Sequence, residues 1–153
     1  MNMLKMHSKI FPEITKEITE EITEEIAQEY TLKFGGCSKD TPGLSGAGAV
    51  IYCNNKEIYG FSKCVGDNIT NNQAEYHGLI LGLQNAITQK VELINVYGDS
   101  ELIIKQMRGE YIVNPPLLFL YQEAKNLEKN FVSIKYHHIY KLDNTRAYDL
   151  ANL

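Results

Sequence analysis

The spacing of apolar residues changes along the chain, and each spacing predicts a type of secondary structure. From residue 30 to residue 34 apolar and polar residues alternate, as they do in a half-buried strand. Similar runs predict further strands at residues 46–52, 58–65, 91–97 and 132–140. Apolar residues spaced three and four apart predict helices at residues 71–89, 100–107, 117–130 and 145–153. Glycine, proline and paired asparagines mark loops between them, at residues 35–43, 54–55 and 114–116.

The order of these elements predicts the class of fold. Three strands joined by hairpins come first, and helices and strands alternate after them. This order is typical of an α/β domain with a mixed five-stranded sheet, in which three antiparallel strands are followed by two parallel ones and helices cover both faces. We assign residues 30–153 to this domain. In such sheets functional residues gather where strands end and helices begin, so these positions are the first candidates for chemistry.

Residues 1–29 precede the first strand and differ from the rest in composition. An isoleucine recurs every fourth residue within a Glu-Ile-Thr repeat, at Ile14, Ile18, Ile22 and Ile26. In a helix these side chains cover roughly a third of the circumference, but the stripe is too short for a stable coiled coil on its own. We interpret the segment as an acidic, partly helical extension that docks on the domain or frays in solvent. The alternative is a helix that binds a protein partner, or a second copy of the chain, through residues 13–29.

Charge is distributed unevenly along the sequence. Residues 1–30 contain three Lys and seven Glu, a surplus of four negative charges that equals the formal net charge of −4 of the whole chain. Residues 31–153 are therefore neutral overall. Composition gives no positive argument for nucleic-acid binding, although a local basic face would be enough for it.

Three cysteines, Cys37, Cys53 and Cys64, form no Cys-x-x-Cys pair. Their odd number favours reduced thiols in an intracellular protein, in the cytoplasm or the nucleus, over disulfides or zinc. No apolar run reaches membrane-spanning length and the N-terminus lacks the apolar core of a signal peptide, so we expect neither secretion nor a membrane partner. The many Ile, Asn, Lys and Tyr residues are typical of an A+T-rich genome, for example a viral one.

One carboxylate stands out at the start of the longest predicted helix. Thr70 and Gln73 have the spacing of a capping box, which places Glu75 in the first turns. Glu75 shares its side of the helix with the apolar residues Leu79, Leu83 and Ala86. A carboxylate at this buried edge is costly without a partner, such as a metal ion or a hydrogen-bond donor. Alternatively, Glu75 merely favours the helix dipole on a surface helix. A second carboxylate, Asp99, ends the fourth predicted strand.

Four segments of the chain resemble the signature blocks of type 1 ribonuclease H: residues 32–49, 71–75, 98–100 and 144–152. The resemblance covers about residue 30 to residue 153 and includes the order of the elements, whereas residues 1–29 have no counterpart. It implies the ribonuclease H fold, affinity for RNA/DNA hybrids, and hydrolysis of the RNA strand with two divalent metal ions, Mg²⁺ or Mn²⁺.

The chain departs from the family pattern at two of four metal-binding positions. Glu75 and Asp99 match two of the carboxylates, but the family's first Asp is replaced by Gly35 and its last Asp by Tyr148. Two divalent ions about 4 Å apart repel each other by on the order of 16 kcal/mol at an effective dielectric constant of 20. Two carboxylates leave most of this repulsion uncompensated, and a protonated phenol is a poor ligand for a hard cation. We therefore expect metal binding to be weak or absent.

Three neighbouring residues are candidate substitutes. Asp149 lies one residue further along a helix, about 100° from the required direction. Asp40 lies five residues beyond Gly35 in a turn. His138 stands ten residues before Tyr148, the spacing of a mobile product-release His in some family members, or it is a structural His at a strand end.

The positions that contact nucleic acid in the family are better preserved than the metal ligands. They are Cys37, Ser38, Asn71, Asn72, Gln73 and Ser100. Amide groups suit this role because a 2′-hydroxyl both donates and accepts hydrogen bonds. Thr41 stands where the family usually has Asn. Residues 108–116, where longer members carry a basic protrusion, contain a single Arg, so we expect weak and salt-sensitive binding.

Three hypotheses follow for the function. The leading hypothesis is a ribonuclease H-like domain that has lost most or all nuclease activity and is retained for binding a hybrid or structured RNA, or for a protein contact through its N-terminal helix. The second is an active nuclease that uses Glu75, Asp99 and Asp149. The third is a structural scaffold that assembles through the N-terminal helix.

Overall fold

A computed structural model describes residues 13–18, 28–40 and 42–153. Residues 13–18 form a helix in which Ile14 and Ile18 are about half-exposed. The rest of the predicted isoleucine stripe, Ile22 and Ile26, lies outside the described residues, as does Thr41. Within the described part, no helix is long and apolar enough to cross a membrane.

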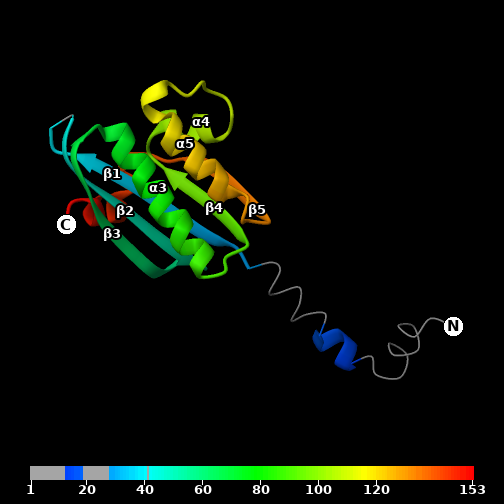
Figure 1. The fold of residues 1–153 in the computed structure, drawn as a ribbon. Coiled ribbons are helices and arrows are strands. Elements are labelled where there is room, and N and C mark those ends of the chain that lie inside the picture. The colour runs from blue at the N-terminus through cyan, green and yellow to red at the C-terminus, as the bar shows by residue number, and fades with distance from the viewer. Residues whose placement is uncertain (1–12, 19–27, 41) are drawn as a thin grey trace.

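The sheet has five strands in the order β3-β2-β1-β4-β5. They are β1 (Tyr30–Ser38), β2 (Gly43–Cys53), β3 (Lys56–Ile69), β4 (Leu93–Gly98) and β5 (Ser133–His138). β1, β2 and β3 pair antiparallel, whereas β4 runs parallel to both β1 and β5 (Figure 1). The predicted mixed sheet is confirmed.

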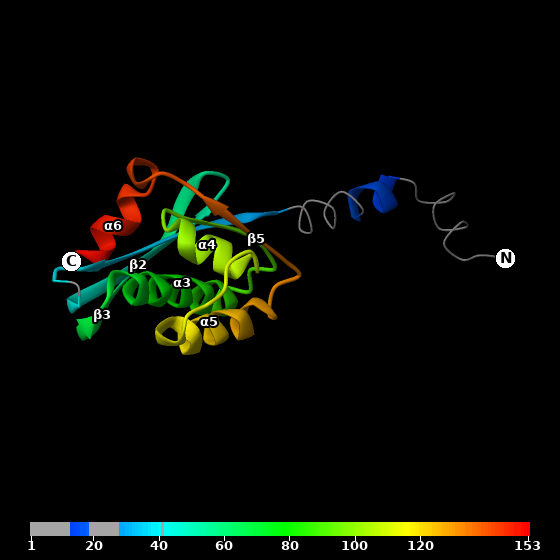
Figure 2. The same cartoon turned by 90° about the horizontal axis from the view of Figure 1, so that it is seen from above.

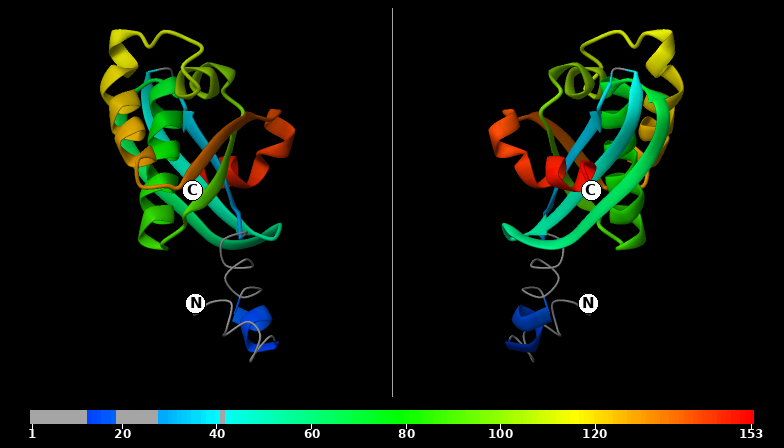
Figure 3. Two further views of the ribbon diagram at one scale, coloured as in Figure 1. Left: turned by 90° about the vertical axis from the view of Figure 1, so that its right-hand side faces the viewer. Right: turned by 90° about the vertical axis from the view of Figure 1, so that its left-hand side faces the viewer.

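Helices cover both faces of this sheet. They are α3 (Asn71–Thr88), α4 (Glu101–Met107), α5 (Pro115–Glu128) and α6 (Thr145–Ala151), with a 3₁₀ turn at Lys141–Asp143. Figures 2 and 3 show α3 and α5 on one side of the sheet and α6 on the other. α6 contacts β1, β2 and β3, so the C-terminus of the described chain lies over the antiparallel half of the sheet.

The predicted boundaries were wrong at several element ends. Residues 35–38, expected to be a loop, continue β1, because they pair with β2 from Gly35 opposite Gly48 to Ser38 opposite Ser45. The glycine signal therefore marks close packing rather than a turn. α5 begins at Pro115, two residues earlier than expected, since proline is tolerated in the first turn of a helix. The paired asparagines do form the hairpin turn, with positive φ at Asn54 and Asn55.

Two glycines allow helices to approach the sheet closely. A Cβ atom at Gly36 would overlap the backbone of Ala74 in α3, and one at Gly48 would overlap the backbone carbonyl of Ala147 in α6. Small residues in β2 were expected where another segment must come near, and α6 is that segment. Gly36 thereby lets α3 lie against β1, and Gly48 lets α6 lie against β2, on the other face of the sheet.

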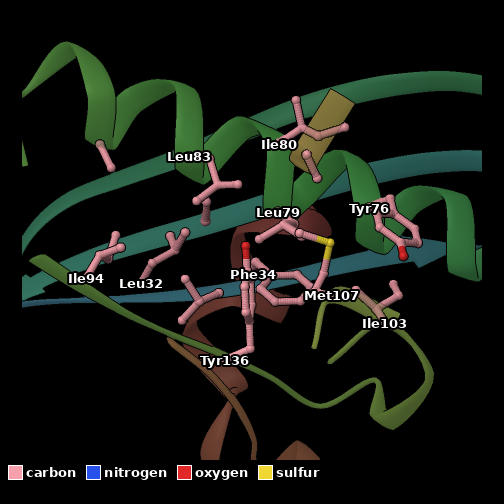
Figure 4. Packing of buried hydrophobic residues seen from close by; sticks show 14 of the residues in the cluster. Leu32, Phe34, Tyr76, Leu79, Ile80, Leu83, Ile94, Ile103, Met107 and Tyr136 are labelled. Carbon is pink, nitrogen blue, oxygen red and sulfur yellow. The ribbon is translucent and has the colours of Figure 1, made fainter. Parts of the chain in front are cut away.

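Two tyrosines, Tyr76 and Tyr136, lie in the core between the sheet and α3, α4 and α5 (Figure 4). Only one of their two hydroxyl groups has a hydrogen-bond partner. The hydroxyl of Tyr76 donates to Gln106 Oε1 at 2.6 Å, and Gln106 Nε2 donates to the carbonyl of Ile112. The hydroxyl of Tyr136 is buried and has no hydrogen-bond partner in the described structure. An unpaired buried polar group is destabilising, whereas a paired one is not.

We expect Tyr136→Phe to raise the free energy of unfolding by about 1 kcal/mol, because it removes an unpaired hydroxyl and keeps the ring. The matched control Tyr76→Phe leaves Gln106 Oε1 without its donor and lowers the free energy of unfolding by about 1–3 kcal/mol. Urea denaturation followed by circular dichroism measures both. A loss of stability in Tyr136→Phe as large as that in Tyr76→Phe would contradict the assignment.

Candidate active site

The start of α3 places Glu75 in the site. Thr70 Oγ1 accepts a hydrogen bond from the backbone nitrogen of Gln73, and Gln73 Oε1 accepts one from the backbone nitrogen of Thr70. The predicted capping box is therefore confirmed, and it fixes where the helix begins. Glu75 is only 8% exposed and lies on the same side of α3 as buried Leu79 and Leu83. This burial favours the prediction of a partnered carboxylate over a surface helix.

Asp99 follows the end of β4, where Asn144 holds it in place. The side-chain amide of Asn144 donates to Asp99 Oδ1 at 2.7 Å and to the backbone carbonyl of Phe34 at 2.8 Å. One buried amide thus ties together β1, the end of β4 and the start of α6. On the other side, His138 Nε2 lies 3.2 Å from the backbone carbonyl of Asp99. His138 is exposed at the end of β5, as expected of a strand-end His.

Tyr148 lies against both carboxylates. Its hydroxyl donates to Asp99 Oδ2 at 3.3 Å, and the negative charges of Glu75 and Asp99 both act on the phenol. The Ser100 side chain lowers the pKa of the Glu75 carboxyl, and its Oγ caps α4 by accepting from the backbone nitrogen of Ile103. Neutral polar groups of the protein itself therefore act on both carboxylates.

Burial sets the protonation of this cluster. Burial and, after it, the negative charge of Asp99 raise the pKa of Glu75 to about 7, while the polar side chains of Ser100 and Tyr148 and the positive charge of Lys141 oppose the rise. Burial and the charges of Glu75 and Asp99 also raise the pKa of Tyr148 above that of an ordinary phenol. Tyr148 therefore stays protonated at neutral pH and remains a donor.

Gly35 completes the cluster on β1. A Cβ atom there would lie 3.5 Å from the Cβ of Ala147 and 3.6 Å from the backbone nitrogen of Tyr148, which are ordinary van der Waals distances. Position 35 therefore faces the start of α6, beside Tyr148, and has room for a side chain. The four positions singled out in the sequence, 35, 75, 99 and 148, come together in one place.

A lysine that the sequence analysis missed also belongs to this site. Lys141, in the 3₁₀ turn, places its Nζ 4.5 Å from the centre of the Tyr148 ring, within cation–π range. A single loop lysine carries no signal in the sequence. The bridging role of Asn144 was missed too, although this residue opens the last of the four signature blocks.

The proposed substitute acids lie elsewhere. Asp149 is exposed, and its negative charge acts on Arg146, which also forms an ion pair with Glu57. Asp40 is exposed in the turn between β1 and β2, and its backbone carbonyl lies 2.9 Å from Ser38 Oγ. The structure brings neither side chain into contact with Glu75 or Asp99.

Several positions expected to contact nucleic acid also stabilise the rim of the site. The backbone nitrogen of Ser38 donates to Asn71 Oδ1 at 2.8 Å, which joins the end of β1 to the start of α3. Ser38 is buried and its Oγ lies 2.7 Å from the carbonyl of Ile69, while Gln73 serves the capping box. Asn72 is exposed and Cys37 is half-buried beside the site.

The donors present do not fit a pair of divalent ions. Mg²⁺ and Mn²⁺ require hard, mostly charged oxygen ligands, and a two-ion site requires several carboxylates. Glu75 and Asp99 are the two carboxylates here, and Asp99 already accepts hydrogen bonds from Asn144 and Tyr148. The buried Oδ1 of Asn144 has no hydrogen-bond partner in the described structure, but a neutral oxygen does not replace a charge. Among the described residues, no group of three or more His, Cys, Asp or Glu side chains could hold a metal ion.

A mixed sheet of this strand order, with a helix-borne Glu beside an Asp at the end of a parallel strand, defines the ribonuclease H-like class. The family model described as "Reverse transcriptase-like" matches residues 33–153. Ribonuclease HI of Halobacterium salinarum is 33% identical over 120 residues, which are 78% of this chain and 60% of that protein. The chain belongs to the type 1 ribonuclease H family.

Other relatives include the bifunctional protein Rv2228c of Mycobacterium tuberculosis, which is 39% identical over 119 residues. These residues are 76% of this chain but only 33% of that protein, so the chain spans about a third of this relative.

The three cysteines of the chain are free, in agreement with the expectation of thiols.

Solved structures agree with this assignment. RNase H1 from H. salinarum superposes with a TM-score of 0.78 at 32% identity, covering 81% of this chain and 95% of that one. The RNase H domain of Rv2228c gives a TM-score of 0.78 at 34% identity, covering 82% and 92%. LC11-RNase H1, solved in complex with an RNA/DNA hybrid, gives 0.76 at 29% identity, covering 80% and 94%.

The raised pKa of Glu75 makes stability depend on pH. The folded protein binds the proton of Glu75 more tightly than the unfolded chain does, so this stabilisation is fully present below about pH 4.5 and is lost as the pH rises through about 7. We expect wild type to lose on the order of 3 kcal/mol relative to Glu75→Gln across this window. Urea denaturation of both proteins from pH 4 to pH 8 measures the difference, and parallel pH profiles would contradict it.

The space at Gly35 and the lack of space at Gly36 predict opposite effects of alanine. We expect Gly35→Ala to raise the free energy of unfolding by about 0.4–1 kcal/mol, because it restricts the unfolded chain and its Cβ fits. Gly36→Ala must push α3 away from β1 and costs about 1–3 kcal/mol or more. Thermal unfolding compares the two variants. Equal destabilisation by both would mean that position 35 cannot accept a side chain.

Proposed function

We propose that this domain derives from RNA/DNA-hybrid nucleases, keeps the ability to bind a hybrid, and has lost all or nearly all of its ability to cleave one. The observation that carries the proposal is the hydrogen bond from the Tyr148 hydroxyl to Asp99 Oδ2, beside the buried Glu75, with no side chain at Gly35. A neutral donor occupies the place where the family pattern has a ligating carboxylate.

Charge supports the loss of cleavage. Two metal ions carry four positive charges, and the family pattern has four carboxylates around them. Here Asp99 carries one negative charge, and Glu75, with a pKa of about 7, carries only part of one at neutral pH. A site with so little negative charge binds hard divalent cations weakly.

The orientation of α6 argues against rescue by Asp149. Delivering Asp149 to the position of Tyr148 requires the helix to rotate by about 100°. That rotation would withdraw Ala147, Leu150 and Ala151, all of them buried, from their contacts with the sheet. The cost of exposing these residues favours the present orientation.

Retained binding is supported by the rim of the site and by the relatives. Asn72 is exposed at the start of α3, and the hydrogen bond between Ser38 and Asn71 fixes the neighbouring strand end. LC11-RNase H1, which shares this fold at 29% identity, was solved with an RNA/DNA hybrid. An RNA/DNA hybrid is therefore the preferred ligand, with structured RNA as the alternative of similar A-form geometry.

We expect wild type to give little or no hybrid cleavage with Mg²⁺ or Mn²⁺. The double variant Gly35→Asp/Tyr148→Asp should cleave the hybrid at least ~10²-fold faster than wild type, which is the effect of one electrostatic contact to the reacting groups. A gel assay with a labelled RNA strand measures both. Adding Glu75→Gln to the double variant should abolish the activity. Turnover by wild type that disappears in Glu75→Gln alone would overturn the proposal.

A further inference from the structure

The site formed by positions 35, 75, 99 and 148 contains its own positive charge. The Lys141 ammonium lies over the ring of Tyr148, whose hydroxyl donates to Asp99, and its charge acts on Glu75. Lys141 is exposed. It forms no salt bridge among the described residues. Its ammonium group can therefore bind a ligand that reaches the site.

The turn that carries Lys141 is fixed to the sheet. Lys33 Nζ, from β1, donates to the backbone carbonyl of Asp143 at 3.1 Å. The backbone nitrogen of Ile139 donates to Gly98, and that of Asn144 donates to the carbonyl of Lys141 itself. The buried amide of Asn144 closes the turn against Asp99. The backbone of Lys141 is thus held beside the site by contacts from β1, β4 and α6, unlike that of a lysine on a free loop.

Removing acids changes what the site can bind. Four ionised carboxylates repel a nucleic-acid phosphate unless metal ions lie between them. Here positions 35 and 148 carry no charge, so Glu75 and Asp99 are the acids that remain, and Asp99 accepts hydrogen bonds from Asn144 and Tyr148. The repulsion of a phosphate is accordingly much smaller, and one ammonium group can outweigh it.

We propose that Lys141 binds a backbone phosphate of the hybrid at this site, so that binding needs no divalent ion. This inference rests on the proposed function, because it assumes that hybrids bind here. The ring of Tyr148 orients the ammonium group through the cation–π contact, and Lys33 positions the turn; these two residues act through Lys141. The ligand class is a nucleic-acid phosphodiester.

The test is fluorescence anisotropy with a labelled RNA/DNA hybrid oligonucleotide and the full chain, in EDTA and in Mg²⁺. We expect the wild-type Kd to agree within about twofold in the two buffers. Lys141→Gln should weaken binding roughly tenfold at 50 mM salt. It should also make the plot of log binding constant against log salt concentration less steep by about 0.9, the value for one lost phosphate contact. Lys141→Arg keeps the charge and should keep most of the affinity.

Lys129→Gln is the matched control. Lys129 is exposed at the C-terminal end of α5, on the opposite side of the sheet from α6 (Figure 2), and it forms no salt bridge among the described residues. Its Kd should equal that of wild type. Equal weakening by Lys141→Gln and Lys129→Gln, or no effect of Lys141→Gln, would overturn the inference. Circular dichroism melting curves confirm that each variant is folded.

The outcomes separate this inference from the proposed function. Wild-type binding that strengthens severalfold with Mg²⁺, without cleavage, overturns the role of Lys141 and leaves the proposed function intact. Metal-dependent cleavage by wild type overturns the proposed function instead. Binding that is equal in EDTA and Mg²⁺ and is lost in Lys141→Gln supports both.

Discussion

The burial of Glu75 beside Asp99 is the constraint on which the rest of the site depends. The capping box fixes the start of α3, and Gly36 lets this helix lie directly on β1, so Glu75 is held in a place where it is only 8% exposed. Two neighbouring acids in such a place must be neutralised, paired with donors or bridged by cations. Type 1 ribonucleases H, by their sequence pattern, surround metal ions with further acids. This chain instead uses hydrogen-bond donors.

The two substitutions make sense as a pair because they act on the same electrostatic problem. An Asp at position 35 would add a negative charge next to Tyr148, and an Asp at position 148 would add another next to Asp99. Without metal ions, both charges would raise the free energy of the folded state. Gly35 adds no charge, and Tyr148 is a neutral donor to Asp99. The cluster therefore contains less negative charge than the four carboxylates of the family pattern.

The sequence predicted the elements in which apolar residues recur at regular spacing, and it predicted the site residues that belong to a sequence motif. The mixed sheet, the capping box and the grouping of positions 35, 75, 99 and 148 all followed from spacing or from the family resemblance. Lys141 and the bridge made by Asn144 could not be predicted, because their roles depend on how a 3₁₀ turn lies against two distant strands. The end of β1 was mistaken for a loop because glycines in a turn and glycines under a helix look alike in the sequence.

The frame of the site and its chemistry depend on different residues. Gly36, Gly48, Asn144 and the capping box hold β1, α3 and α6 together through packing and neutral hydrogen bonds, and none of these contacts requires a metal ion. A chain can therefore keep the family fold, with TM-scores of 0.78 to its relatives, while the acids at the centre change. Because neighbouring acids repel each other, a chain with fewer of them at this place has less repulsion for the frame to withstand. Membership of the family thus follows from the frame, whereas activity must be inferred from the side chains within it.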